Sequence, residues 1–225
     1  MNDYTAGKAF KEKKALRIMS AGFGLFAERG IEQVTLQEIS DECGVGRTTT
    51  FRYFPTKTEL VVAIGVWKWK EFIELHNSVL PAEEMEKMTG AEYLRFFLDG
   101  FLLLYREHKD ILRFNYNFNS FLACQKGTPE QKLPYTRMID VLGVQFHEVY
   151  ERGQRDGTIN ADIPETTMFS SIFHIMLAAV TRYAVGLAVI IDSDPEQELV
   201  MLADMMLTRF TKGDIGMQPG ALPGG

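Results

Sequence analysis

A run of basic and hydroxyl side chains between Gly46 and Pro55 has the chemistry to bind nucleic acid. The run reads Arg-Thr-Thr-Thr-Phe-Arg-Tyr, and almost all of these side chains can donate hydrogen bonds to phosphates or to base edges. Such contacts need a rigid element that holds the side chains in place. A short helix that begins at Arg47 and stops before Pro55 would be that element, because the residue before a proline is pushed out of helical geometry.

Another short helix is expected just before this run, joined to it by a glycine turn. Thr35, with Glu38 three residues later, forms a capping box that begins the helix. The sequence Gly44-Val45-Gly46 then ends it. Two short helices joined by a tight turn form a helix-turn-helix, which lays its second helix in the DNA major groove. The bare pattern is a weak signal, so two packing helices around a glycine turn are the alternative.

The flanking segments favour the helix-turn-helix. Upstream, apolar residues recur at helical spacing from Ile18 and stop at Gly30, which suits a C-terminal cap. Downstream, Thr56 and Glu59 form another capping box. The arrangement resembles the TetR family of bacterial transcriptional regulators over the first third of the chain. The matching residues are Leu25-Phe26-Ala27-Glu28-Arg29-Gly30, Thr35, Ile39, Gly44-Val45, Thr49, Tyr53-Phe54-Pro55, Lys57 and Leu60.

The resemblance implies an all-α, nine-helix TetR-like architecture with a three-helix DNA-binding domain at residues 1–56. A helical effector-binding and dimerisation domain would follow at residues 57–212. The tail at 213–225 is rich in Gly and Pro and is expected to be disordered. The implied partner is a double-stranded DNA operator. The expected DNA contacts are Thr35, Arg47, Thr48, Thr49, Phe51, Arg52, Tyr53 and Lys57.

Three residues depart from the family pattern. Gly46 stands where a serine is common, so the second helix loses a side-chain cap, although glycine caps nearly as well. Phe51 replaces the usual tyrosine and so lacks a hydroxyl that commonly touches a phosphate. Thr48 stands where a small residue is frequent. We expect DNA binding to survive these changes.

The net charge of −6 does not exclude a DNA-binding protein, because the charge is unevenly distributed. Residues 1–60 carry nine Lys and Arg against eight Asp and Glu, whereas the rest of the chain is distinctly acidic. A near-neutral segment can present its cations on one face. Lys8, Lys11, Lys13 and Lys14 suit a phosphate backbone, and a solubilising terminus is the alternative.

Other classes of protein find little support. Cys43 and Cys124 offer neither a disulfide framework nor a metal spacing, although a redox-sensing Cys124 is left open. The four histidines show no metal-binding spacing, and no catalytic motif or cofactor fingerprint is present. The beginning of the chain does not resemble a signal peptide. The apolar stretch 172–191 is interrupted by His174, Thr181 and Arg182, so we expect a buried helix rather than a membrane span. We expect a cytoplasmic protein that uses no cofactor.

Beyond Lys57 the sequence predicts a helical bundle. A charged linker is expected at 82–88, and Thr89 with Glu92 forms a capping box. Pro164 suits the first turn of one helix, and Asp194-Pro195 begins the last. The expected helices cover residues 57–79, 89–108, 110–124, 130–156, 164–191 and 195–210.

Aromatic residues are concentrated in this bundle. Most of them must be core, but their number, with interspersed asparagines, favours an apolar cavity with a few polar anchors. The resemblance implies an effector cavity between these helices, and the aromatic lining indicates a lipophilic or aromatic small molecule. A constitutive DNA-binding regulator without an effector is the alternative. The candidate lining residues are Trp69, Phe72, Phe97, Phe101, Phe118, His147 and His174.

A homodimer through the last two helices is also expected. The helix after Pro164 carries small residues that allow close helix approach, and the final helix carries an apolar stripe at Leu199, Leu202, Met206 and Phe210. A symmetric dimer implies a palindromic operator. The alternative to this dimer is that both apolar faces belong to the internal core.

We also expect a route for release from DNA. A ligand that tilts the helix 57–79 would change the separation of the two DNA-reading helices of the dimer, and the repressor would leave its operator.

Overall fold

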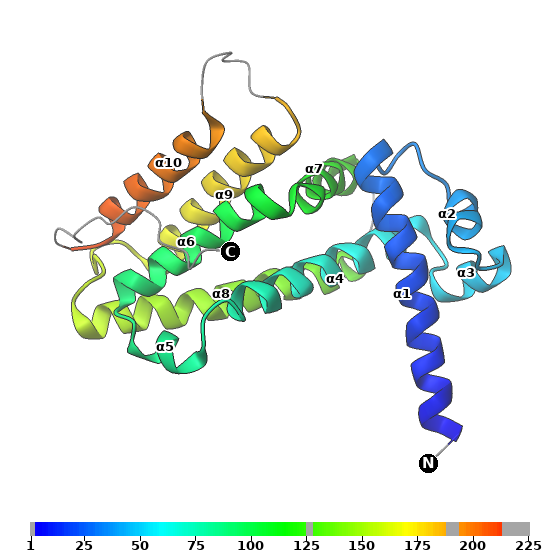
Figure 1. The fold of residues 1–225 in the computed structure, drawn as a ribbon, viewed down its shortest axis with the longest axis horizontal. Coiled ribbons are helices and arrows are strands. Elements are labelled where there is room, and N and C mark those ends of the chain that lie inside the picture. Colours follow the sequence, from blue (N-terminus) through cyan, green and yellow to red (C-terminus); the bar gives the residue numbers. More distant parts are fainter. Residues whose placement is uncertain (1–2, 125–127, 188–193, 213–225) are drawn as a thin grey trace. The chain divides into compact units, whose positions relative to one another are not determined.

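The computed structural model describes residues 3–124, 128–187 and 194–212, with side chains from Lys11 onward. Its regular elements are α-helices (Figure 1), together with one isolated antiparallel bridge between Ile159 and Thr211. No described helix combines the length and apolarity needed to cross a membrane. The helices are α1 (Asp3–Arg29), α2 (Leu36–Cys43), α3 (Arg47–Tyr53), α4 (Lys57–Asn77), α5 (Ala82–Lys87), α6 (Gly90–Glu107), α7 (Lys109–Cys124), α8 (Pro129–Asp156), α9 (Glu165–Ala184) and α10 (Pro195–Phe210).

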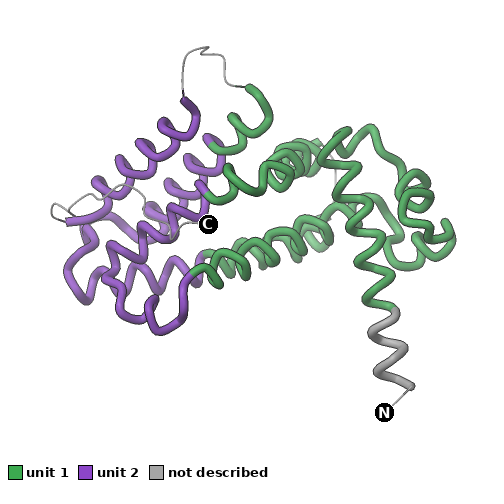
Figure 2. The backbone as a smooth tube through the Cα atoms, in the orientation of Figure 1, with its two compact units in different colours: residues 1–79, 103–142, 180–189 green, residues 80–102, 143–179, 190–225 purple. Residues whose placement is uncertain are grey.

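The chain divides into two compact units that alternate along the sequence (Figure 2). Unit 1 comprises residues 1–79, 103–142 and 180–189, and unit 2 comprises the remainder. The helix-turn-helix segment therefore shares a unit with α4 and α7. The expected functional division into 1–56 and 57–212 stays a prediction, and the tail 213–225 lies outside the described residues.

Unit 1 is organised by α1, α4 and α7, which pack against one another, and by α2, which packs on α1 and on α3. Phe26, Ile39 and Leu60 are fully buried, and they form one core with Phe114 and Phe118 of α7. Burying such side chains contributes roughly 1.5–3 kcal/mol each. The core of the DNA-binding segment therefore continues into a helix that lies far away in sequence.

Unit 2 has an aromatic core. Phe146 is fully buried, and its ring centroid lies 5.4 Å from those of Phe97 and Phe169. Gly90 and Gly153 let two helices approach closely, since a Cβ at Gly90 would lie 2.1 Å from the Gly153 Cα. The buried rings confirm that aromatic residues build a core here.

The predicted helix starts are confirmed by their caps. The Thr35 hydroxyl accepts from the Glu38 N–H while the Glu38 carboxylate accepts from the Thr35 N–H, and Thr56 repeats this arrangement with Glu59. The corresponding bonds join Thr89 to Glu92, and Asp194 caps α10 through the N–H groups of Glu196 and Gln197.

Several expected boundaries were wrong. The described residues form ten helices rather than nine, because the charged linker contains α5, which begins after Pro81. The helix from Lys57 ends at Asn77, and that after Pro164 ends at Ala184. Gly186, at φ 74°, adopts left-handed geometry that stops the latter helix. The rest of its predicted length, 188–191, lies outside the described residues.

The apolar stripe predicted for dimerisation on α10 was also wrong. Leu199, Met206 and Phe210 are buried within the chain, and Leu202 is half-buried. The alternative reading as internal core is correct for this stripe. The exposed apolar side chains of α10 are instead Met201 and Met205, which are 57% and 61% exposed.

Candidate nucleic-acid interface

The turn between α2 and α3 is fixed by backbone geometry. Gly44 lies at φ 61° and ψ 29°, in the left-handed region, and its N–H donates to the Asp41 carbonyl. The Val45 N–H donates to the Ser40 carbonyl at 3.1 Å, so the free carbonyls at the end of α2 are satisfied. Arg17 of α1 donates to the Cys43 carbonyl at 2.6 Å. This cation at the C-terminal end of α2 complements the helix dipole and holds the turn on α1.

The inner face of α3 is attached to α2 by a buried polar contact. The hydroxyls of Ser40 and Thr50 lie 2.9 Å apart, and both side chains are buried. Thr50 therefore cannot serve as a DNA contact, although the sequence pattern grouped it with the other hydroxyl residues of this helix. Gly46 caps α3 without a side-chain hydrogen bond, as its residue type predicts.

The outer face of α3 presents the predicted contacts. Arg47, Thr48, Phe51 and Arg52 are exposed there, and Thr49 and Tyr53 are half-buried. The Arg47 Cζ atom lies 5.5 Å from the centroid of the Phe51 ring, and the Arg52 Cζ atom lies 5.9 Å from that of Tyr53. This face carries two guanidinium groups and an exposed hydroxyl. Such groups can contact phosphate oxygens and base edges.

Thr35 and Lys57, which were predicted to contact phosphates, also make contacts within the protein. The Thr35 hydroxyl is engaged in its capping box, and Glu38 also pairs with Arg29 at 2.7 Å. The bond from the Thr35 N–H, helped by Arg29, lowers the pKa of Glu38 to about 2. Lys57 donates to the Glu32 carbonyl at 3.3 Å, and partial burial lowers its pKa.

Three of the predicted effector residues lie in unit 1. Trp69 is 4% exposed and meets Phe72 edge to face, with ring centroids 6.3 Å apart. Phe118 is 1% exposed and lies 4.5 Å, centroid to centroid, from Tyr135. The Tyr135 hydroxyl donates to the buried Asn115 side chain at 3.5 Å and accepts from the Trp69 indole, and burial raises its pKa to about 12.

The other predicted effector residues lie in unit 2. Phe97 and Phe101 contact each other, with ring centroids 6.0 Å apart. His174 is exposed. His147 is also exposed, and its Nδ1 lies 3.0 Å from Glu165, which raises its pKa through hydrogen bonding and charge. An effector site formed by these residues and those of unit 1 stays a prediction.

Sequence reasoning missed the residues that fix the site from within. Arg17 and Ser40 position the turn and α3, while Tyr135 donates near Trp69 to Asn115, one of the interspersed asparagines that the sequence did indicate as polar anchors. Arg17, Ser40 and Tyr135 each act across a long sequence separation or from a buried face, so helical spacing gave no signal for them. Cys43 is buried and Cys124 is exposed. Within the described part of the chain, no group of His, Cys, Asp or Glu could hold a metal ion.

Comparison with known proteins places this site in a family. Residues 18–64, from α1 into α4, match the family of bacterial regulatory proteins, tetR family. The HTH-type transcriptional regulator YerO of Bacillus subtilis is 30% identical over 108 residues, which are 45% of this chain and 34% of YerO. The chain thus spans only about a third of the length of this relative. The transcriptional repressor KstR2 of Rhodococcus jostii is 22% identical over 90% of this chain and 94% of its own length.

The fold is shared with solved regulators. The transcriptional regulator FadR of Bacillus subtilis, solved in complex with stearoyl-CoA, has a TM-score of 0.67 at 18% identity. The match covers 86% of this chain and 97% of FadR. The family consists of transcriptional regulators rather than enzymes, which agrees with the missing catalytic motifs. The helix-turn-helix and its match to the family pattern place residues 18–64 in the TetR family of bacterial transcriptional regulators, and the remaining helices share the fold of solved regulators.

Proposed function

We propose that the protein is a DNA-binding transcriptional regulator that reads an operator in the major groove with α3. The observation that carries this proposal is the two-sided character of α3. Thr50 attaches one face to α2, while Arg47, Thr48 and Arg52 are exposed on the other. A recognition helix needs such an arrangement, because its register must be fixed while its base-reading side chains stay accessible.

Fluorescence anisotropy with a labelled duplex, recorded over a series of salt concentrations, tests the proposal. The Arg47→Ala/Tyr53→Ala double variant should bind at least tenfold more weakly, because it loses one charged and one hydroxyl contact. The control is Arg155→Ala, which removes an exposed arginine from the end of α8 in unit 2. Equal affinities for the parent and the double variant would rule out α3 as the DNA-reading helix.

We further propose that a lipophilic or aromatic small molecule releases the protein from DNA, so that the protein acts as a repressor. The Trp69–Tyr135–Asn115 contact supports this proposal, since it sets polar anchors among the apolar rings of Phe72 and Phe118. FadR of Bacillus subtilis, which has the same fold, was solved in complex with stearoyl-CoA. KstR2 is a repressor.

Release would act through helices that contact the DNA-binding core. A Cβ at Gly65 of α4 would lie only 3.2 Å from the Phe118 ring of α7, so these two helices are closely packed at this point. A ligand that displaces either one would move the core that holds α3. The ligand can release the protein only if it binds the released state more tightly than the DNA-bound state. A complete switch needs a difference of several kcal/mol in binding free energy.

The two tryptophans allow a direct test. In a Trp67→Phe variant, Trp69 is the only tryptophan left. A compound that raises the melting temperature and releases DNA should also change the emission of Trp69. A releasing compound that leaves this emission unaltered would put the site elsewhere. If lipophilic and aromatic compounds neither stabilise the protein nor release DNA, the constitutive regulator is the correct reading.

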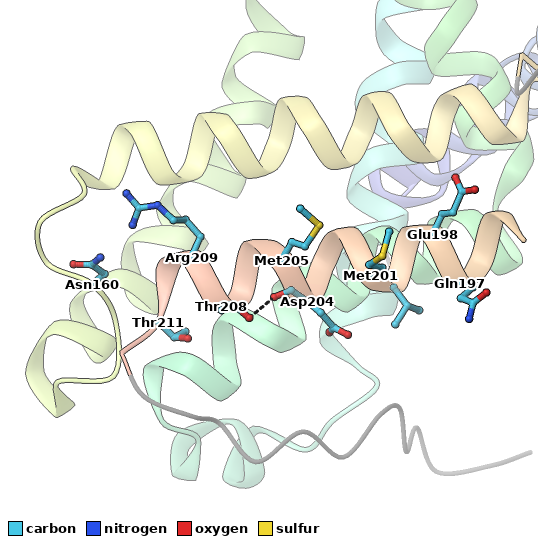
Figure 3. Close-up of a pocket in the computed structure, with 10 residues that line it drawn as sticks. Asn160, Gln197, Glu198, Met201, Asp204, Met205, Thr208, Arg209 and Thr211 are labelled. Atoms are coloured by element: carbon cyan, nitrogen blue, oxygen red, sulfur yellow. Dashed lines mark hydrogen bonds between the residues drawn. The ribbon is translucent and has the colours of Figure 1, made fainter. Parts of the chain in front are cut away.

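We also propose a homodimer in which a second copy covers the outer face of α10. A groove of about 990 Å³ runs along this helix (Figure 3), and the exposed Met201 and Met205 lie in it between Glu198 and Arg209. Apolar side chains bordered by opposite charges suit a self-complementary interface. A dimer whose two α3 helices lie ~34 Å apart would read the two half-sites of a palindromic operator. We expect the protein to act in the cytoplasm, where that DNA lies.

Sedimentation of a Met205→Glu variant tests the dimer. We expect a dimeric parent and a monomeric variant, because the new carboxylate would be buried without a partner. Val144 is the control, since it is 71% exposed on α8 of the same unit, and Val144→Glu should stay dimeric. A dimeric Met205→Glu protein would move the interface away from this groove.

A further inference from the structure

The Arg47 guanidinium lies over the exposed Phe51 ring on the outer face of α3. The Cζ atom is 5.5 Å from the ring centroid, within the range of a cation–π contact. The two residues are four positions apart, so they are neighbours on one helix face. Phe51 remains 36% exposed, so the pair is accessible on the outer face of the helix.

Arg47 differs from Arg17 and Arg29 of the DNA-binding segment in what it contacts. Arg17 donates to the Cys43 carbonyl, and Arg29 pairs with Glu38. Within the described residues, the ring of Phe51 is the partner that the structure gives to Arg47. The N–H groups at the edge of its guanidinium are therefore not committed to an acceptor in the protein.

A guanidinium held over an aromatic ring is ready for one kind of base contact. A cation–π contact uses the charge of the group and needs no hydrogen bond, so its N–H donors stay available. Two of these donors match the O6 and N7 acceptors that guanine presents in the major groove. A free arginine side chain loses much rotamer freedom on binding. An arginine held over a ring has lost part of that freedom before DNA arrives.

We propose that Phe51 is a positioning residue that holds Arg47 ready to read a guanine in the operator. The inference rests on the proposed DNA-reading function and specifies the base and the pair of residues that select it.

The neighbouring pair Arg52 and Tyr53 has a different geometry. These residues are adjacent in sequence, so their side chains leave the helix in different directions. Tyr53 is half-buried, and the Arg52 Cζ atom is 5.9 Å from its ring centroid. Arg52 is therefore assigned to the phosphate backbone, where it would strengthen binding to every sequence rather than to one base.

The experiment begins with selection of preferred duplexes from a random library by the full-length parent protein. At each guanine of the selected operator, the affinity is compared with that for a duplex carrying another base pair there. At the one guanine that Arg47 reads in each half-site, Phe51→Leu should reduce the preference for guanine about two- to fivefold per recognition helix. Phe51→Tyr keeps the ring and should keep the preference.

A double-mutant cycle separates positioning from direct contact. In an Arg47→Ala background, Phe51→Leu should cause no further loss of guanine preference, because Phe51 acts through Arg47. An equal loss on all duplexes, or a further loss in the Arg47→Ala background, would overturn the positioning role. If the parent selects no sequence at all, the proposed DNA-reading function fails instead, and this role fails with it.

Discussion

The helix-turn-helix and the aromatic core of unit 2 are stabilised by different kinds of interaction. The first depends on directional contacts at a few positions, such as the Thr35 capping box, the left-handed Gly44 and the Ser40–Thr50 hydroxyl pair. The second depends on ring contacts spread over many residues. Substitutions in unit 2 should therefore mainly change stability, and substitutions in the helix-turn-helix should mainly change geometry.

The largest expected effect comes from removing a ring from unit 2. Phe146→Ala should lower the free energy of unfolding by ~3–5 kcal/mol, because it leaves a cavity between Phe97 and Phe169. Urea denaturation measures the change. Tyr116→Ala is the control, since Tyr116 is 47% exposed and its loss should cost less than ~0.5 kcal/mol. Similar costs for both variants would contradict the assignment of this core.

The close approach of two glycines in unit 2 gives the next effect. Gly90→Ala would place a methyl group against the Gly153 backbone and should cost ~2–3 kcal/mol of unfolding free energy. Gly143→Ala is the matched control, because a Cβ there meets nothing within 4 Å, and a helical alanine should stabilise slightly. The prediction fails if Gly90→Ala is as stable as the parent.

A cap in the DNA-binding unit gives a smaller effect. Thr56→Ala removes the hydroxyl that accepts from the Glu59 N–H at the start of α4. It should lower the free energy of unfolding by ~1 kcal/mol, whereas Thr56→Ser should keep the cap. Chemical denaturation of the three proteins decides this, and a Ser variant as unstable as the Ala variant would argue against the capping role.

The smallest effect is a pH dependence that arises from Glu38. Its pKa in the folded protein is about 2, below the ordinary value of 4.5. The ionised carboxylate therefore contributes stability that is present above pH 4.5 and is lost as the pH falls towards 2. A Glu38→Gln variant should lose less stability than the parent over this range. If the free energy of unfolding changes with pH in the same way for both proteins, the capping box and Arg29 do not stabilise the ionised Glu38 carboxylate.

Local signals predicted the helix-turn-helix well, because they act within three or four residues. Thr35, Thr56 and Gly44 each mark a helix end through their own contacts with the nearby backbone. The bundle was harder to predict. Leu199 and Met206 lie on an apolar stripe that is equally consistent with an interface or a core, and only the fold shows that they are buried. The long-range contact of Tyr135 with Asn115 left no pattern in the sequence.

The central claim is that the outer face of α3 reads DNA, and selection from a random duplex library by the parent and by Arg47→Ala tests it most directly. The parent should enrich a palindromic motif with half-sites ~10 base pairs apart, centre to centre. Arg47→Ala should enrich the same motif with the preference relaxed at a single base pair in each half-site. If the parent enriches no motif, or both proteins enrich identical motifs, the account of α3 as the reading helix is contradicted.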